Sequence, residues 1–298
     1  MIGKEKIVVK KYQTNGLDLS KKYNAVLLAD LHLVKSINRK MLNNINNYLI
    51  QVRKNIDFIF MSGDLSYYKY YLDNSNFDYL KSTIHNFSEL AEAPLYACLG
   101  NHDFGIFSNE NEELIRKRFD ELKYNSNIIP LDNKRANFNE EITITGITPD
   151  NSIYKSKTYN GENGVILNDT LKQFDKLDDK YSIALIHDPL SVYYASKNNS
   201  EHVNKYNLIL CGHEHGGYLS EKQMIKKNDG YGYVEYFRNF KPYMKIPCCY
   251  GKYKLTNNTE MIVTEGIKRF NGYIPSFIYT TPFVTEIEIK PKKLVKHI

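Results

Sequence analysis

The sequence predicts an α/β fold in which parallel strands carry polar clusters at their carboxyl ends. Three apolar runs, residues 25–29, 58–61 and 94–99, have the length and composition of strands buried on both faces. Amphipathic segments separate these runs, and a β-α-β-α-β order favours parallel neighbours with right-handed crossovers. Each run is followed closely by Asp, Asn or His. Because ligands of open α/β sheets bind outside the carboxyl ends of the strands, we expect the functional site along that edge.

Helices are predicted where apolar residues recur at intervals of three and four. Met41, Ile45 and Leu49 mark the first helix, and Phe77 and Ile84 mark the second. Segments without this period are expected to be loops. One of them is rich in tyrosine, and solvent exposure explains its rings better than stacking on a substrate. The expected helices are residues 36–54, 76–93, 109–123 and 169–177, and the expected loops are residues 67–76 and 149–164.

Further strands are predicted in order along the chain. A strand near residues 7–12 leads to a turn at Asn15 and Gly16. Pro189 cannot continue a ladder, so the strand before it ends at His187. A turn around Asn257 joins two strands as an antiparallel hairpin. These further strands are residues 128–131, 142–147, 183–186, 208–211, 250–255, 261–265 and 283–289.

Length, charge and cysteine usage narrow the class of protein. The chain has 298 residues, of which 42% are apolar and 25% charged, as in ordinary globular proteins. The net charge of +6 suits an anionic substrate. Without a clustered basic patch it does not indicate nucleic acid, which stays open as a partner. Two of the four cysteines are adjacent, so no disulfide framework is expected.

The sequence also bears on location and domain organisation. Residues 1–24 lack the apolar segment of a signal peptide, and no run approaches the roughly 20 apolar residues of a membrane helix. We therefore expect a cytoplasmic protein with reduced thiols, whose oligomeric state is left open. No repeat, linker or change of composition divides the chain. We expect one domain over residues 1–298, with a loop and hairpin insertion at about 218–247 that reaches over the site.

Two strand ends carry a histidine two residues from another candidate ligand. Asp30 and His32 follow the first apolar run, and His213 and His215 lie in a Gly-His-x-His-Gly turn after residues 208–211. In an extended chain, residues two apart point the same way, so each pair can aim at one place beyond its strand. Taken alone, a helix N-cap role for Asp30 and an exposed polar turn for the two histidines stay open as alternatives.

Together the strand ends supply seven candidate ligands, with nitrogen and oxygen atoms and no cysteine. Such a set suits first-row divalent ions such as Mn, Fe, Zn or Ni. One catalytic metal typically takes about three protein ligands and a water, so seven candidates indicate two metals. His102 is a further candidate ligand. The candidates are Asp30, His32, Asp64, Asn101, His187, His213 and His215.

The order and spacing of these clusters resemble the calcineurin-like metallophosphoesterase family, whose motifs are D-x-H, G-D, G-N-H-[DE], H and G-H-x-H. All five are present between Asp30 and His215, and the following Gly216 and Gly217 resemble the small single-domain bacterial members. The resemblance implies the metallo-dependent phosphatase fold, a four-layer α/β/β/α sandwich of two mixed β-sheets flanked by helices. It also implies a hydrolase acting on phosphoric ester bonds, with two divalent metal ions and a small phosphorylated substrate.

The resemblance assigns each candidate a role. Asp64 would bridge the two ions, because a carboxylate has an oxygen for each. His102 would protonate the leaving group as a general acid, with Asp103 orienting its ring. A hydroxide that bridges the ions would attack the phosphorus of a mono- or diester. The remaining ligands would divide into Asp30, His32 and His215 for the first ion and Asn101, His187 and His213 for the second.

Some branches of the family fit less well than others. Phosphoprotein phosphatases carry Asp and Arg soon after the G-D motif, whereas residues 65–68 are Leu-Ser-Tyr-Tyr, which weighs against phosphoprotein substrates. Tyr218 stands where small relatives often have Gln. We expect specificity in the loops at 66–76, 149–164 and 218–247. Three alternatives stay open: a nuclease, a lipid-linked pyrophosphate hydrolase covered by the insertion, and a non-catalytic scaffold, which the complete ligand set disfavours.

Overall fold

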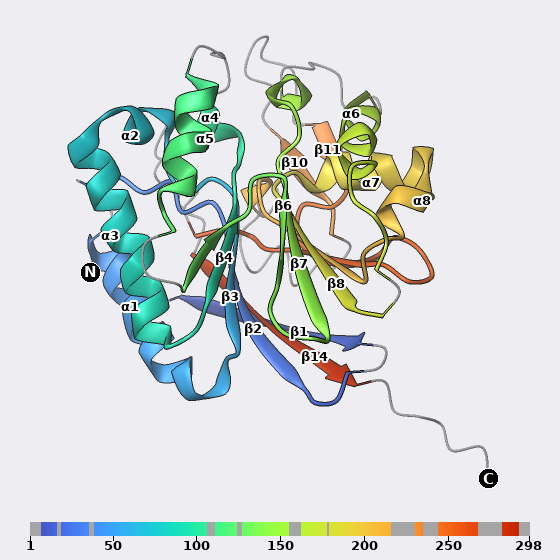
Figure 1. Cartoon of the computed structure of the whole chain (residues 1–298), viewed down its shortest axis with the longest axis horizontal. Coiled ribbons are helices and arrows are strands. Elements are labelled where there is room, and N and C mark those ends of the chain that lie inside the picture. The colour runs from blue at the N-terminus through green and yellow to red at the C-terminus, as the bar shows by residue number, and fades with distance from the viewer. Residues whose placement is uncertain are drawn as a thin grey trace.

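Two six-stranded sheets lie between layers of helices in the computed structural model (Figure 1). It describes residues 7–16, 19–35, 39–105, 111–123, 127–154, 162–177, 179–215, 230–234, 244–267 and 282–291. In spatial order, the first sheet contains β1 (Val8–Gly16), β14 (Phe283–Pro291), β2 (Tyr23–Leu28), β3 (Phe58–Ser62), β4 (Leu95–Cys98) and β5 (Ile128–Pro130). The second contains β12 (Gly251–Lys254), β13 (Glu260–Val263), β9 (Leu208–Cys211), β8 (Tyr181–Ile186), β7 (Ile142–Ile147) and β6 (Lys134–Asn137).

Both sheets are mixed, as the resemblance implies. Strands β2, β3, β4 and β5 run parallel to one another, whereas β14 runs antiparallel to β2 and parallel to β1. In the second sheet β13, β9, β8 and β7 are parallel, and the two edge strands β12 and β6 are antiparallel to their neighbours. The predicted hairpin is therefore present as β12 and β13. The parallel strands place their carboxyl ends along one edge of each sheet.

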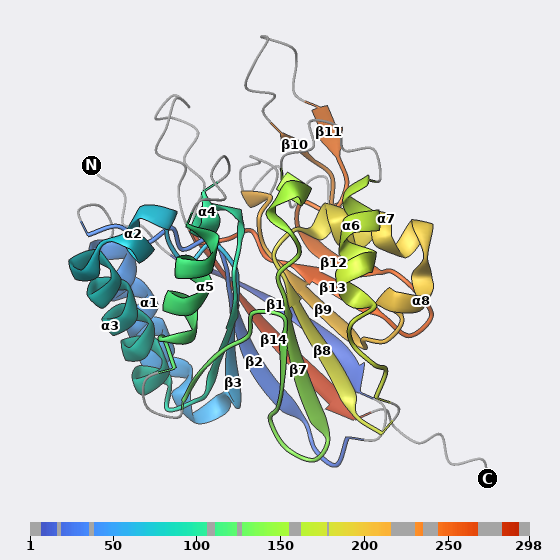
Figure 2. The ribbon, with the colours of Figure 1, turned by 45° about the horizontal axis from the view of Figure 1, so that its top comes forward.

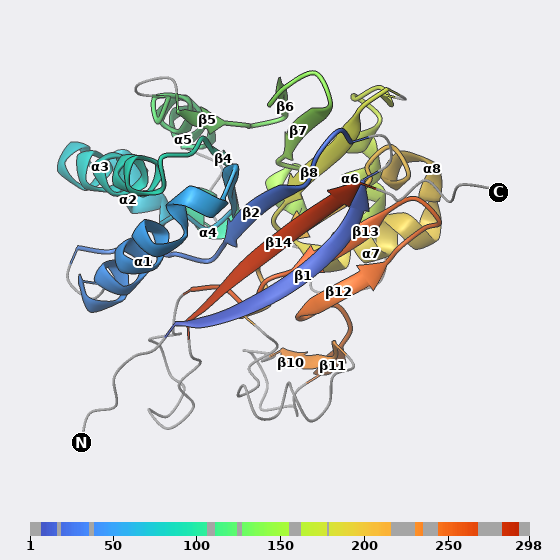
Figure 3. The same cartoon turned by 90° about the horizontal axis from the view of Figure 1, so that it is seen from below.

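Helices cover the outer face of each sheet, which completes four layers (Figure 3). The two sheets face each other between these helices (Figure 2). The first sheet is covered by α1 (Arg39–Val52), α2 (Tyr68–Leu72), α3 (Asn74–Ala91) and α5 (Glu112–Asp120). The second is covered by α6 (Glu162–Leu171), α7 (Pro189–Asn198) and α8 (Ser200–Val203). The α/β/β/α arrangement expected from the resemblance is confirmed.

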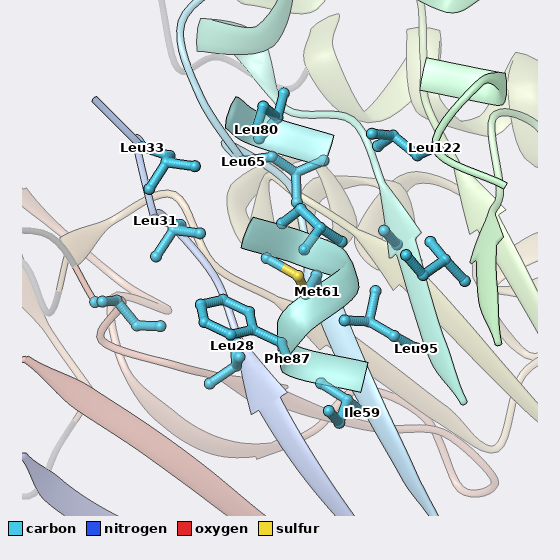
Figure 4. Packing of buried hydrophobic residues seen from close by; sticks show 14 of the residues in the cluster. Leu28, Leu31, Leu33, Ile59, Met61, Leu65, Leu80, Phe87, Leu95 and Leu122 are labelled. Atoms are coloured by element: carbon cyan, nitrogen blue, oxygen red, sulfur yellow. The ribbon is translucent and has the colours of Figure 1, made fainter. Parts of the chain in front are cut away.

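The apolar runs form strands because both of their faces are buried. In β2, Val26 and Leu28 face the helices, while Ala25 and Leu27 face the second sheet. Figure 4 shows Leu28 and Phe87 among the side chains packed between the first sheet and its helices. Each fully buried Leu or Phe contributes about 1.5–3 kcal/mol. Because both faces are buried, apolar residues follow one another without interruption in these runs and do not alternate with polar residues.

Two predicted loops contain helices. Residues 67–76 were expected to be a solvated loop, but they hold α2 and the start of α3. Tyr70 and Tyr71 are buried there, and the Asp73 carboxylate caps α3 by accepting a hydrogen bond from the Asn76 N–H at 2.8 Å. Residues 149–164 were also expected to be irregular. They include the 3-10 helix η2 (Asn151–Tyr154) and the first turn of α6. Helix α6 ends at Leu171, so most of the helix predicted at 169–177 is not present.

Helix α7 was also not predicted, although its signal is in the sequence. The Asp188 carboxylate accepts a hydrogen bond from the Leu190 N–H, and Pro189 is the first helical residue. An N-cap Asp followed by Pro is a typical helix start. The strand β6 was likewise not predicted. Its residues are partly exposed and lack an apolar period.

Parts of the expected insertion lie outside the described residues, as do Gly216, Gly217 and Tyr218. Of residues 218–247, the backbones of β10 (Gly232–Val234) and β11 (Met244–Ile246) are described, and they pair antiparallel as a hairpin does. Among the described helices, none has the length and apolar composition needed to span a membrane. The four cysteines, Cys98, Cys211, Cys248 and Cys249, are buried and form no disulfide among the described residues.

Candidate metal centre

Residues that follow strands of both sheets converge on one site. Asp30 and Asp64 follow β2 and β3 of the first sheet, and His187 and His213 follow β8 and β9 of the second. The backbone N–H of His213 donates to both carboxylate oxygens of Asp30, at 3.1 and 3.0 Å. His187 Nδ1 lies 2.8 Å from the carbonyl oxygen of Ser62, to which it donates. These hydrogen bonds tie the two sheets together at their carboxyl ends.

The first group of candidate ligands contains Asp30, His32 and His215. Each offers one ligand atom, and these atoms lie within 4.8 Å of one another. The rings of His32 and His215 stack with centroids 5.4 Å apart, and His215 Nε2 lies 3.8 Å from Asp30 Oδ1. All three residues are buried. The structure therefore brings together the three residues that the resemblance assigned to the first ion.

The second group contains Asp64, His187 and His213, whose ligand atoms also lie within 4.8 Å of one another. His187 Nε2 lies 3.2 Å from His213 Nδ1 and 3.1 Å from Oδ1 of Asn101. Asn101 lies in α4 (Asn101–Phe104), which directly follows β4. This group thus contains His187 and His213, and the third residue that the resemblance assigned to the second ion, Asn101, lies beside it.

Asp64 stands between the two groups, and its oxygens have different surroundings. Oδ1 accepts a hydrogen bond from the His102 N–H at 2.8 Å. Oδ2 lies 3.2 Å from His187 Nε2 and 3.5 Å from His32 Nε2, so it faces both groups. Among the described residues, this buried oxygen has no hydrogen-bond donor with good geometry. A buried carboxylate oxygen in that position, between the ring nitrogens of two histidines, fits the binding of cations.

Burial and charge set the protonation of the ligands. Burial lowers the pKa of His213 to about 4 and that of His215 to about 3, so both rings are neutral near pH 7. Burial would also lower the pKa of His187, but the Asp64 and Asp30 carboxylates outweigh it and raise that pKa to about 10. Because His187 Nδ1 donates to Ser62, the proton at Nε2 is the one that a cation would replace.

The backbone at the site is left-handed, which corrects the extended geometry expected for the two histidine pairs. The φ angle is +54° at Asp30, +42° at His32, +52° at Asp64, +73° at His213 and +46° at His215. Such a conformation is uncommon for residues other than glycine and stores strain of order 1 kcal/mol each. His213 and His215 join different groups rather than aiming at one place, whereas Asp30 and His32 join the same group.

His102 and Asp103, the expected acid and its partner, differ in burial. His102 is partly exposed, and its ring centroid lies 4.7 Å from that of His32. Asp103 is fully buried, and burial together with Asp64 raises its pKa to about 7. Its oxygens accept hydrogen bonds from the N–H groups of Leu65, Ser66 and Gly100 and from the Tyr71 hydroxyl. Asp103 therefore holds two strand-end loops together. That it orients the His102 ring stays a prediction.

Two tyrosines beside the site were not among the predicted site residues. The Tyr67 ring centroid lies 5.3 Å from that of His32 and 5.5 Å from that of His102. The Tyr154 ring centroid lies 5.6 Å from that of His213. Tyr67 was expected in a solvated loop. Its place three residues after the G-D motif was the available signal, whereas nothing in the local sequence singled out Tyr154.

The sequence matches a family of known proteins. Residues 23–217 match the calcineurin-like phosphoesterase family, while no curated protein matches significantly. Similar solved structures include a dimetal phosphatase from Danio rerio, at 11% identity and a TM-score of 0.48, covering 82% of this chain and 87% of that one. GAP50, the anchor in the inner membrane complex of Plasmodium, has 14% identity and a TM-score of 0.46, with 91% and 82% covered.

A purple acid phosphatase from yellow lupin (Lupinus luteus) seeds is also similar, at 16% identity and a TM-score of 0.39, with 66% of this chain and 38% of that one covered. The family match itself extends over more than half of the sequence and includes every motif from Asp30 to His215. The chain therefore belongs to the calcineurin-like phosphoesterase family, which makes it a hydrolase acting on phosphoric ester bonds.

Proposed function

We propose that this protein is a dinuclear metal-dependent phosphoesterase that hydrolyses phosphate mono- or diesters at the site around Asp64. The observation that supports this most strongly is the position of Asp64 Oδ2, which lies within 3.5 Å of a histidine nitrogen from each ligand group. A single buried oxygen that faces both groups suits a ligand shared by two cations. The family is known for two-metal sites, and the two groups supply the ligands for them.

The donor set favours first-row divalent ions such as Mn, Fe, Zn or Ni. Two such ions, when bound, would activate a water and stabilise the charge on the transferring phosphoryl group. The negative charge of the buried carboxylates also favours bound cations at the site. Asp30 and Asp64 are buried carboxylates at the place where an anionic phosphate has to bind. Without cations they would repel it. Asn101 adds a neutral oxygen, which limits this negative charge.

His102 is the residue that we assign to the leaving group. Its backbone N–H donates a hydrogen bond to Asp64 Oδ1, and its ring lies against that of His32. The imidazole therefore stands next to the place where a phosphate would bind, and it is still partly exposed. As a general acid it would transfer a ring proton to the departing oxygen, which makes the alcohol a better leaving group. Asp103 supports this arrangement by holding the loop that carries His102 against residues 65 and 66.

We also propose that residues 1–298 form one domain. The pairing of β1 with β14 supports this, because it joins the first described strand to the last within one sheet. We also propose that loops determine the substrate specificity, as expected from the sequence, and two contacts support this. Tyr67 lies in the predicted loop 66–76 and Tyr154 in the predicted loop 149–164, and both rings contact candidate ligands.

The test is hydrolysis of p-nitrophenyl phosphate and bis-p-nitrophenyl phosphate by protein stripped of metal and then supplied with Mn²⁺, Ni²⁺ or Zn²⁺. We expect no turnover with EDTA and restored turnover on adding metal. Hydrolysis of the diester would assign a phosphodiesterase, and hydrolysis of the monoester alone a phosphatase. Bound metal without turnover of either compound, or of any phosphoester in a broad panel, would contradict the proposal and favour a scaffold.

A further inference from the structure

Only some residues at the site are open to an approaching substrate. Asp30, His32, Asp64 and His187 are buried almost completely. Tyr67 and His102 are partly exposed and lie against His32, whereas Tyr154 and His213 are partly exposed and lie against His187. The ring contacts pair Tyr67 with His102 and Tyr154 with His213. Each of the two ligand groups therefore has a partly exposed tyrosine ring beside it.

Tyr67 stands on the side of the general acid. Its ring is nearly perpendicular to that of His102, with an interplanar angle of 87° and centroids 5.5 Å apart, and it is tilted by 35° against His32. The leaving group has to lie next to His102 to receive its proton. Among the residues that the structure describes, Tyr67 is the tyrosine whose ring contacts His102, so its phenol borders the place that the leaving group would take.

The position of Tyr67 is fixed before any substrate binds. The preceding residue is held twice, since the Ser66 N–H donates to Asp103 at 3.0 Å and the Ser66 hydroxyl donates to the Leu33 carbonyl at 2.6 Å. On the other side, the Tyr67 carbonyl accepts a hydrogen bond from the Tyr70 N–H at 2.8 Å as α2 begins. A ring presented on such a backbone loses little conformational entropy when a ligand stacks on it.

We propose that Tyr67 is the leaving-group contact of this enzyme and selects phosphoesters whose leaving group carries a planar aromatic ring. This inference rests on the proposed function, because it takes the side of His102 as the leaving-group side. Stacking or edge contact between the two rings would strengthen binding of an aromatic ester over an aliphatic ester of the same size.

Benzyl phosphate and cyclohexylmethyl phosphate test this, because their leaving oxygens are both alkoxides and their rings are of similar size. We expect Tyr67→Ala to lower kcat/KM for benzyl phosphate about tenfold, mainly through KM, and to change that for cyclohexylmethyl phosphate less than about twofold. Tyr67→Phe keeps the ring and should retain the preference. Tyr68→Ala is the matched control, since Tyr68 is the neighbouring tyrosine and is 41% exposed.

A binding measurement separates failure of this proposal from failure of the proposed function. Calorimetry of metal-loaded protein with benzylphosphonate and cyclohexylmethylphosphonate needs no turnover, and it should show tighter binding of the aromatic compound in wild type and Tyr67→Phe only. Equal losses for the two ligands in Tyr67→Ala would overturn the proposal. So would loss of metal in Tyr67→Phe, since the hydroxyl would then serve the metal site.

Discussion

The Nε2 atom of His187 lies 3.2 Å from Oδ2 of Asp64, and this contact joins the carboxyl end of β8 to that of β3 across the two sheets. The His187 ring reaches Asp64 over Gly63, where no side chain intervenes. A β-carbon on Gly63 would overlap the Nδ1, Cγ and Cβ atoms of His187, and the φ angle of Gly63 is +84°. Gly63 therefore provides both the turn after β3 and the space for a ligand from the other sheet.

Gly63→Ala should accordingly damage the site as well as the fold. We expect the free energy of unfolding to fall by about 2 kcal/mol or more, and the second ion to be lost because His187 is displaced. Urea unfolding and metal analysis measure the two effects. Gly251→Ala is the control for strain alone, since Gly251 has a φ of +105° and no atom within 4 Å of an added β-carbon. Similar results for both variants would refute the steric role of Gly63.

Removal of one ligand from the first group should empty that group alone. We expect His32→Ala to reduce the bound metal from two ions per chain to one, because Asp64, His187, His213 and Asn101 remain in place. The number of ions is measured by elemental analysis after dialysis. His85→Ala serves as the control, since His85 lies in α3 and pairs with Glu89. Two ions retained in His32→Ala would place the first ion elsewhere.

His102→Ala should keep both ions and slow turnover. The ring is assigned to proton transfer, a contribution of typically 10²–10⁴ in rate, and its loss matters most when the leaving alkoxide is a strong base. We therefore expect a much larger loss for an alkyl phosphate than for p-nitrophenyl phosphate. Steady-state kinetics on the two esters measure the difference. An equal loss for both esters would argue against the general acid.

Glu265 should make stability depend on pH. It is 3% exposed, neither of its carboxylate oxygens has a hydrogen-bond partner among the described residues, and burial raises its pKa from 4.5 to about 7. The folded protein thus keeps a proton that the unfolded chain loses near pH 4.5. This contribution to stability is complete below that pH and is lost as the pH rises through about 7, by up to about 3 kcal/mol.

Glu265→Gln removes this titration. The free energy of unfolding of the variant, relative to that of wild type, should therefore increase between about pH 5 and about pH 8. Urea unfolding of both proteins in EDTA at the two pH values measures the change. The carboxylates of Asp30 and Asp103 titrate in both proteins and cancel in the comparison. A constant difference between variant and wild type would show that Glu265 has the same pKa in the folded and unfolded chains.

The sequence was informative where a physical requirement repeats along the chain. Strands such as β2 and β3 were predictable because burial on both faces demands continuous apolar residues, and the ligands follow such strands directly. The left-handed backbone at Asp64 and His213 was not predictable, since hydrogen bonds from distant loops maintain it. Helix α2 was missed for a similar reason: its tyrosines are buried by tertiary packing rather than by a local period.

The contacts of Asp103 and Tyr154 show the same limit. That Asp103 orients its sequence neighbour His102 stays a prediction. The donors of its hydrogen bonds could not be predicted, because they come from the loop after β3 and from α2 as well as from the nearby Gly100. Adjacent residues on a helix do not face each other, and a buried carboxylate accepts from whichever donors the fold supplies. Tyr154 contacts His213 only because the loop after β7 turns towards β9 in space.

The most direct test of the two-metal site is the metal content and turnover of Asp64→Asn beside wild type, both dialysed against Mn²⁺. Asn keeps the shape of the side chain but removes the charge that faces both ligand groups. We predict two ions per chain and metal-dependent phosphoesterase activity for wild type, and fewer than one ion with no activity for a folded Asp64→Asn. Two retained ions and unchanged turnover in the variant would contradict the account.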